Sequence, residues 1–146
     1  MENPLTGYVR VKAICLFRHE GLLLAIDDYD PMKRQCFWVP VGGRVEFGEP
    51  SRQAIVREVR EELGVEITGL ELLGVLENLF TFDGEPGHEI VFVYDAQFIE
   101  MAMYDAGSVT GMEGDKEFVA HWIDPSAPAH NRPLYPEGLL SLIETH

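Results

Sequence analysis

Glutamate side chains are concentrated in one short part of the chain, between positions 49 and 62. Together with one arginine they form the set Glu49, Arg57, Glu58, Glu61 and Glu62. This is more negative charge than a helix needs for solubility. Carboxylate oxygens at such density are typical of sites that bind hard divalent cations. The spacing therefore predicts a metal site on one helix and the loop that enters it.

These residues belong to the stretch GRVEFGEPSRQAIVREVREELGV, which runs from Gly43 to Val65. The stretch resembles the Nudix box of the Nudix hydrolases. In that box a glycine, five residues and a glutamate are followed, after seven residues, by Arg-Glu-aliphatic-any-Glu-Glu-any-Gly-aliphatic. Every fixed position is matched, and the preceding WVPVGG is similar as well. The resemblance, to small MutT-like members, implies an α/β fold, an α/β/α sandwich with a mixed sheet.

The resemblance also implies the ligands of Mg²⁺, or of Mn²⁺: the Gly42 carbonyl oxygen and the carboxylates of Glu58, Glu61 and Glu62. It implies that Arg57 orients the glutamates and pairs with Glu49. Positions four apart on a helix share a face, so Glu58 and Glu62 are neighbours and Arg57 reaches Glu61. Arg57, Glu58 and Glu61 are accordingly expected to be catalytic residues.

The implied reaction is hydrolysis of a nucleoside diphosphate linked to a moiety X. Metal ions neutralise the phosphoryl oxygens and activate a water that attacks one phosphorus. A general base is also needed. The candidates are Glu61, His88, Glu89, Glu113 and Glu117. In the family a late loop supplies an extra ligand or base, so we expect Glu117 first, as metal ligand and catalytic residue, and Glu113 second.

Residues that contact the substrate are harder to predict. Arg44 follows the Gly-Gly bend and is well placed to meet a phosphate; Arg10, Lys33 and Arg34 are further candidates. Phe80 and Phe82 flank a predicted loop and are candidates for stacking on a base, local packing being the alternative. His88 is expected to contact substrate. Nucleoside triphosphates and dinucleoside polyphosphates are the expected substrate classes.

Hydrophobic periodicity indicates the elements that position these residues. The box helix is predicted at Ser51–Leu63, with Pro50 in its first turn and Gly64 as its C-terminal cap. A second helix is predicted at 137–145. Strands are predicted at 8–17, 22–26, 37–41, 65–77, 88–98 and 117–123. Loops are predicted at 27–35, 80–87 and 101–116, with an irregular segment at 125–136.

Composition limits the classes of function. A chain of 146 residues is expected to form one domain, 1–146. Its formal net charge of −14 disfavours binding to a DNA duplex and suits a site neutralised by metal ions. Two cysteines without zinc spacing, and the absence of a leader or membrane span in the sequence, favour a cytoplasmic protein. The partner is expected to be a small-molecule nucleotide, and a homodimer is plausible.

Two other functions remain open at this stage. One is a non-catalytic, nucleotide-sensing Nudix domain; the intact set of glutamates and the acidic charge speak against it. The other is a prenyl-diphosphate isomerase on the same fold, which needs a catalytic cysteine. Cys15 and Cys36 lack the surrounding motif expected for that role.

Overall fold

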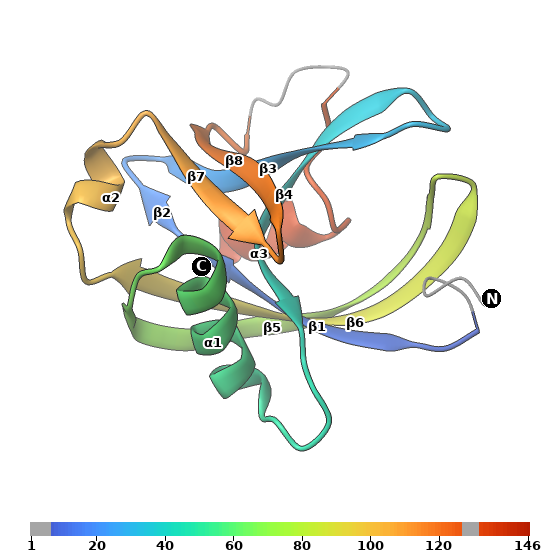
Figure 1. Ribbon diagram of the computed structural model, residues 1–146, viewed down its shortest axis with the longest axis horizontal. Coiled ribbons are helices and arrows are strands. Elements are labelled where there is room, and N and C mark those ends of the chain that lie inside the picture. The colour runs from blue at the N-terminus through green and yellow to red at the C-terminus, as the bar shows by residue number, and fades with distance from the viewer. Residues whose placement is uncertain (1–6, 127–131) are drawn as a thin grey trace.

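The computed structural model describes residues 7–126 and 132–146 of the chain. One mixed sheet forms the middle layer, with helices on its two faces (Figure 1). The strands are β1 (Arg10–Leu16), β2 (Arg18–His19), β3 (Leu22–Asp30), β4 (Gln35–Arg44), β5 (Ile67–Phe82), β6 (Glu85–Phe98), β7 (Ser108–Glu113) and β8 (Lys116–Ile123). The helices are α1 (Ser51–Leu63), α2 (Ala102–Asp105) and α3 (Leu139–Thr145). The predicted α/β/α sandwich is confirmed.

The strand order is β5-β6-β1-β4-β3-β8-β7, with β2 paired to β3. The pair β1–β6 is parallel and the other pairs are antiparallel. Strand β4 joins two halves of the sheet, since residues 35–40 pair with β3 and residues 41–44 pair with β1. The two halves diverge from this strand (Figure 1). A cavity lined by residues of β1, β3, β4, β5 and β6 lies between the two halves.

Helix α1 has the predicted bounds, because its signals are local. Pro50 precedes it in an extended conformation. Gly64 ends it in the left-handed region at φ 70°, and its N–H donates to the carbonyl of Arg60. Glycine takes this conformation without the steric cost that a β-carbon brings. The buried face of the helix holds Ala54, Ile55 and Val59.

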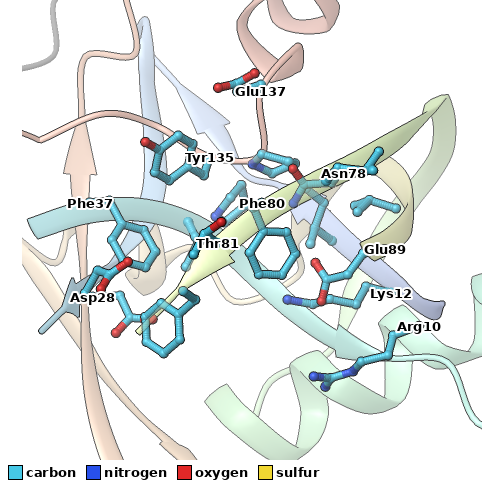
Figure 2. A pocket seen from close by; sticks show the side chains of 18 of the residues that line it. Arg10, Lys12, Asp28, Phe37, Asn78, Phe80, Thr81, Glu89, Tyr135 and Glu137 are labelled. Atoms are coloured by element: carbon cyan, nitrogen blue, oxygen red, sulfur yellow. The ribbon is translucent and has the colours of Figure 1, made fainter. Parts of the chain in front are cut away.

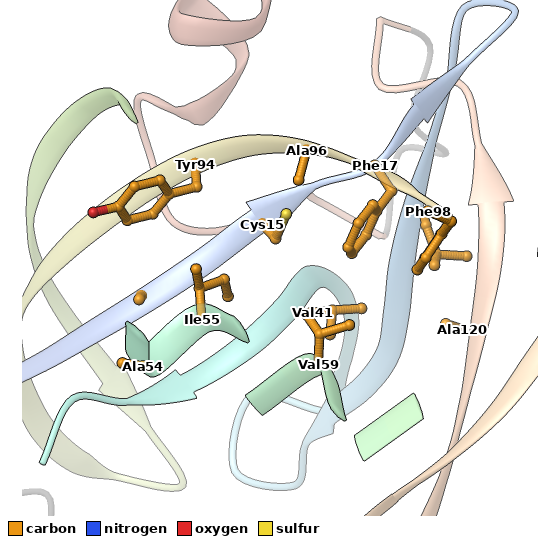
Figure 3. Close-up of a cluster of buried hydrophobic side chains, with 12 residues drawn as sticks. Cys15, Phe17, Val41, Ala54, Ile55, Val59, Tyr94, Ala96, Phe98 and Ala120 are labelled. Atoms are coloured by element: carbon orange, nitrogen blue, oxygen red, sulfur yellow. The ribbon is translucent and has the colours of Figure 1, made fainter. Parts of the chain in front are cut away.

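Two clusters of apolar side chains cover the two faces of the sheet. The α1-side core contains Ala13, Cys15, Val41, Ala54, Ile55, Val59, Tyr94, Ala96, Phe98 and Ala120, with Phe17 and Leu24 (Figure 3). The α3-side core contains Ile14, Leu16, Leu23, Val91, Val93 and Leu139. Successive residues of a strand point to opposite faces, so β1 and β6 contribute to both cores. Each helix is held by apolar contact with one face.

Three predicted loops are wrong in part. Residues 27–30 and 35–36 extend β3 and β4, and residues 80–82 and 85–87 extend the β5–β6 hairpin around the turn at 83–84. The segment 101–116 contains α2 and β7. These polar stretches are stabilised by backbone pairing with a neighbouring strand. Such pairing cannot be recognised from the hydrophobic periodicity of the sequence. Helix α3 begins at Leu139 rather than 137, because Gly138 has φ 90°. Part of the irregular segment, 127–131, lies outside the described residues.

Among the described residues, no helix has both the length and the apolar character that crossing a membrane requires.

Candidate active site

Arg57, in the middle of α1, is the centre of a network of charged side chains. Its Nε and Nη2 donate to the two carboxylate oxygens of Glu49 at 2.8 and 2.9 Å. Its Nη1 donates to Glu58 at 2.9 Å and to Glu61 at 3.2 Å. Nη2 also donates to the carbonyl of Arg44 at 3.0 Å. One guanidinium thus connects three glutamates to the end of β4, as bidentate geometry allows.

The network shifts the protonation of its members. Hydrogen bonds from Arg57 lower the pKa of Glu49 to about 2. The same bonds to Glu49, with further ones to Glu58, raise the pKa of Arg57 above its usual range. Glu49 therefore remains a carboxylate at any physiological pH, and Arg57 remains a cation.

Glu58 occupies a space that exists because residue 43 is a glycine. A β-carbon at Gly43 would overlap the Glu58 carboxyl group. Gly42 is equally confined, since a β-carbon there would overlap the carbonyl oxygen of Ala13 on β1. The Gly-Gly pair thus lets β4 approach both β1 and the helix. It also puts the backbone of residues 42–43 beside the Glu58 carboxylate, which is 14 % exposed.

Glu62 is almost fully buried, with 7 % of its surface exposed. Burial raises its pKa well above the usual range; a hydrogen bond to Glu58 and the negative charges of Glu58 and Glu113 act in the same direction. The positive charge of Lys12 opposes them. The charges of Glu58 and of the exposed Glu113 thus act on the buried Glu62, at a cost in free energy that a cation would relieve.

Glu113 reaches this site because β7 packs against the end of α1. A β-carbon at Gly111 of β7 would lie 2.7 Å from the carbonyl oxygen of Glu62. Gly111 and Glu113 are two residues apart, so their side-chain positions share the face of β7 that meets α1. Gly111 was not recognised in the sequence, where it appeared as one glycine of a loop.

Glu117 lies on the other face of the sheet. In the β7–β8 register it pairs with Met112, while Gly111 pairs with Phe118 and Glu113 with Lys116. Phe118 and Ala120 belong to the α1-side core. By alternation along β8, Glu117 points away from that core. The geometry therefore brings Glu113, and not Glu117, to the buried glutamates.

The predicted substrate-contacting residues fall into two groups. Phe80 and Phe82 line a cavity of about 330 Å³, which is described below. Arg44 is exposed and is not among the lining residues; its carbonyl oxygen is engaged by Arg57. His88 stands within 3.1 Å of Glu77 and belongs to the face of β6 opposite the cavity. The structure does not bring His88 to the box glutamates.

The cavity lies between the two diverging halves of the sheet, on the face opposite α1 (Figure 2). Its lining includes aromatic and aliphatic side chains together with the charged residues Arg10, Lys12, Asp28, Asp30, Lys33, Glu89 and Glu137. The box glutamates do not line it. Lys12 is the connection between the two regions, because it lines the cavity and its charge acts on Glu62.

The donor set suits a divalent cation, although it is not arranged around one. Within residues 7–126 and 132–146, no three side chains of His, Cys, Asp or Glu form a ready-made metal site. Glu61 turns its carboxylate to Arg57 and is 60 % exposed. Glu58, Glu62 and Glu113 nevertheless bring three carboxyl groups together, opposed by Lys12 near Glu62 and by Arg57, which is bonded to Glu58. Oxygen donors in excess of nearby cations are the chemistry that Mg²⁺ and Mn²⁺ select.

Comparisons with known proteins agree with this geometry. The "Uncharacterized Nudix hydrolase YvcI" of Bacillus subtilis is 34 % identical over 105 residues, which cover 70 % of this chain and 60 % of that protein. The "8-oxo-dGDP phosphatase NUDT18" of Danio rerio is 34 % identical over 116 residues, 77 % of this chain and 31 % of that protein. The chain thus spans less than two thirds of each of these curated relatives.

A solved structure shares the whole fold. The MutT NUDIX hydrolase from Burkholderia pseudomallei superposes with a TM-score of 0.68 at 25 % identity, over 96 % of this chain and all of that one. The family model of the NUDIX domain matches residues 8–139, which include the box, the cavity and every strand. The chain therefore belongs to the Nudix hydrolase family.

Proposed function

We propose that this chain is a divalent-metal-dependent pyrophosphohydrolase, which cleaves a nucleoside diphosphate linked to a moiety X by attack of water on phosphorus. The observation that carries the proposal is the carboxyl cluster of the buried Glu62 with Glu58 and Glu113, beside the Arg57 network. A purely structural role does not explain it, because the carboxyl groups outnumber Arg57 and Lys12, the cations beside them, and burying a carboxyl group costs free energy.

In this proposal Glu58, Glu62 and Glu113 hold Mg²⁺ or Mn²⁺, with the Gly42 carbonyl oxygen as a further ligand, and Glu61, also expected as a ligand, is left free to act as the base. The bound metal neutralises the diphosphate and lowers the pKa of a water. Glu113 takes the place first expected for Glu117, since it faces Glu62. Arg57 fixes the carboxylate of Glu58 through the bond from Nη1, so the ligand is oriented before substrate arrives.

We propose Glu61 as the general base. Its carboxylate is exposed, and one oxygen, Oε2, accepts a bond from Arg57 at 3.2 Å. The other oxygen, Oε1, is then oriented by the same bond and accepts a proton from the attacking water. Attack and proton transfer require reactants held in one geometry, which the Arg57 network provides.

The relative NUDT18 is named as a phosphatase of 8-oxo-dGDP, a nucleoside diphosphate. This supports nucleotide substrates for the present chain. The expected classes remain nucleoside triphosphates, dinucleoside polyphosphates and related diphosphates. A small molecule of this kind carries several negative charges, so on a chain of net charge −14 its binding depends on local cations and on bound metal.

The test is product release from a panel of nucleoside triphosphates, dinucleoside polyphosphates, nucleotide sugars and ADP-ribose, with Mg²⁺, with Mn²⁺ and with chelator. Glu58→Gln and Glu62→Gln should each reduce turnover by more than about 100-fold, since even the partners of metal ligands contribute about 10–100-fold. Glu71→Gln is the matched control, because Glu71 is exposed on β5.

Metal-dependent cleavage of one class, lost in both variants, supports the proposal and identifies X. Cleavage that persists in chelator, or full turnover in both variants, contradicts the metal assignment. A protein that binds nucleotide and cleaves no member of the panel would instead be a nucleotide-sensing domain.

A further inference from the structure

Strand β5 forms one edge of the sheet. It is 16 residues long, and β6 is its only strand neighbour among the described residues. The outward backbone N–H and C=O groups of such an edge can pair with a strand of another chain. Proteins block this pairing with short edge strands, bulges, prolines or lysines. A long edge without these devices is therefore a candidate interaction surface.

The two halves of β5 differ in how well they are protected. In the first half the pairing with β6 shifts register twice, within residues 68–71 and 72–74. From residue 75 to residue 82 the register is regular, and side chains alternate strictly between exposed and half-buried. This second half contains neither proline nor lysine, and Glu77 is its only charged residue. Residues 75–82 are therefore unprotected, and we call them the open edge.

Exposed apolar side chains lie on one face of the open edge. Val75 is 49 % exposed and Leu79 is 67 % exposed. Val75 pairs with Phe92 of β6, which packs against the α1-side core, so both side chains belong to the face that carries α1. The β5–β6 hairpin reaches past α1 (Figure 1), and this part of the face stays exposed to water. A strand added at the edge would cover both side chains.

The open edge is held in one shape before any partner arrives. Asp30, which is buried at the end of β3, accepts through Oδ1 the N–H groups of Met32 at 3.0 Å and of Lys33 at 3.2 Å. The same atom accepts the N–H of Asp83, at the tip of the β5–β6 hairpin, at 3.2 Å. One carboxylate thus ties the tips of the two hairpins together. An edge fixed in this way loses less conformational freedom when it binds.

The charge of the chain restricts where two copies can meet. With a net charge of −14, two copies repel each other unless the surfaces in contact carry little charge. The open edge is such a surface. Its one carboxylate, Glu77, has Oε2 within 3.1 Å of Nε2 of His88 on β6, so it has a hydrogen-bond partner in its own chain. The open edge therefore permits self-association of this acidic protein.

The sequence of the open edge is complementary to itself. Two copies of one strand that pair in antiparallel fashion are related by a two-fold axis. With the axis at Glu77, Val75 lies opposite the partner's Leu79, so apolar side chains meet at two symmetric places. With the axis at Leu76 or at Asn78, Glu77 would instead lie opposite an apolar side chain of the other copy. The pattern therefore selects Glu77 as the position of the axis.

We propose that the open edge binds the open edge of a second copy of this chain, antiparallel and with the two-fold axis at Glu77. The sheets of the two copies then form one continuous sheet. Asn78, Phe80 and Phe82 alternate with the exposed residues and line the cavity. The partner strand therefore supports the outer wall of the cavity in each copy. The inference concerns assembly and does not depend on the proposed function.

The first experiment is sedimentation velocity of the full chain over a range of protein concentrations. The wild type should approach twice the 16.5 kDa mass of one chain as the concentration rises. Val75→Lys should weaken dimerisation by more than about tenfold, because the ammonium group of each copy would lose water against an apolar side chain. Glu77→Gln should strengthen it by roughly 1.5- to 5-fold, because two like charges at the axis are removed.

Two lysine variants serve as matched controls. Val11→Lys changes an exposed valine on the same face, but β1 lies inside the sheet. Met112→Lys changes an exposed apolar residue on β7, the strand at the other edge. Both should dimerise like the wild type, and circular dichroism checks that all variants are folded. A dimer that survives Val75→Lys but is lost in either control forms through another surface, which overturns the inference. So does a wild type that stays monomeric at its highest soluble concentration.

The second experiment tests the register by cross-linking. Glu77→Cys in a Cys36→Ser background puts two thiols opposite each other at the axis. Opposite residues of antiparallel strands have Cα atoms about 4.5 or 5.5 Å apart, within the range of about 4.4–6.8 Å that a disulfide bridges. Mild oxidation should therefore give a covalent dimer that reduction reverses. Glu71→Cys, exposed on β5 outside the open edge, should stay monomeric under the same oxidation. Equal cross-linking of both variants contradicts the register.

Hydrogen exchange of the wild type at a low and a high protein concentration completes the test. Pairing of the two edges gives new acceptors to the outward N–H groups of residues 75–82, so their exchange should slow at the high concentration. The N–H groups of β7 should exchange at the same rate in both samples. A dimer in which residues 75–82 exchange as fast as in the monomer contradicts pairing through this edge.

Discussion

Replacing Glu62 by glutamine should stabilise the metal-free protein and abolish its activity. Burial and the neighbouring carboxyls of Glu58 and Glu113 raise the pKa of Glu62 in the folded state. In the unfolded chain the same group ionises near pH 4.5. Above that pH the unfolded state is stabilised because its Glu62 releases the proton, whereas Glu62 in the folded state stays protonated. The stability of the wild type therefore falls as pH rises from about 4.5 toward the raised pKa.

The size of the effect follows from linkage. Each pH unit in this window lowers the free energy of unfolding by at most about 1.4 kcal/mol. Between pH 5 and pH 7 the loss is at most about 3 kcal/mol. A glutamine at position 62 keeps the shape of the protonated acid and still donates a hydrogen bond toward Glu58, but it does not titrate. The variant should therefore lose none of this stability between the two pH values.

The assay is urea unfolding in the presence of chelator at pH 5, 6, 7 and 8, followed by the fluorescence of Trp38 and Trp122. The difference in stability between Glu62→Gln and the wild type should grow as pH rises, and Glu71→Gln should follow the wild type. Added Mg²⁺ should reverse the order, because metal binding requires the ionised carboxylate and stabilises only the wild type. Parallel stability curves for wild type and Glu62→Gln from pH 5 to pH 8 would refute the reasoning.

Three further predictions concern the same region. Gly43→Ala should destabilise the protein by about 1–3 kcal/mol through overlap with the Glu58 carboxyl and should displace that ligand; thermal unfolding measures this against Gly107→Ala, where an added β-carbon meets nothing within 4 Å. Glu113→Gln should lower kcat/KM by at least about tenfold while Glu117→Gln changes it little; the opposite ranking in steady-state kinetics would restore Glu117 to the site. Asp30→Ala should lower stability by about 1–3 kcal/mol, because three N–H groups lose their acceptor, and hydrogen exchange should become faster at the tips of both hairpins; unchanged exchange at Asp83 would contradict the tie between them.

Local features of the chain were predictable because their causes are local. Helix α1 has the bounds Ser51–Leu63 that its apolar stripe, Pro50 and Gly64 indicate. Arg57 and Glu61 are four residues apart and therefore neighbours on one face of the helix. The hydrogen bond expected between them is observed, with a length of 3.2 Å. The box also indicated the family, which fixes the order of layers in the sandwich.

Strand extensions were missed because they depend on a partner far away in the chain. The polar segment 27–30 has no apolar alternation, yet it pairs with residues 35–38 of β4. Likewise, nothing local shows that the predicted loop at 80–87 is the end of a long hairpin tied to Asp30 through Asp83. Backbone pairing and a buried acceptor stabilise these segments, and neither leaves a periodic pattern.

Only the tertiary structure decided which of the two late-loop glutamates lies near the buried Glu62. Glu113 and Glu117 are both plausible in the sequence, and both lie in the β7–β8 hairpin. The register of that hairpin turns Glu113 toward Glu62 and Glu117 to the opposite face. A shift of one residue in this register would move each of the two glutamates to the opposite face of the sheet, because side chains alternate along a strand.

The sequence by itself determined the carboxyl-rich helix and its network, since those contacts join residues within one or two turns of each other or across one short loop. Only the tertiary structure decided which residues form the cavity on the other face of the sheet. Lys12 of β1, Phe37 of β4 and Phe80 of β5 are separated by dozens of residues and meet in one cavity because β4 passes from one half of the sheet to the other. Long-range strand pairing is set by the packing of both cores at once, and no spacing within the chain encodes it.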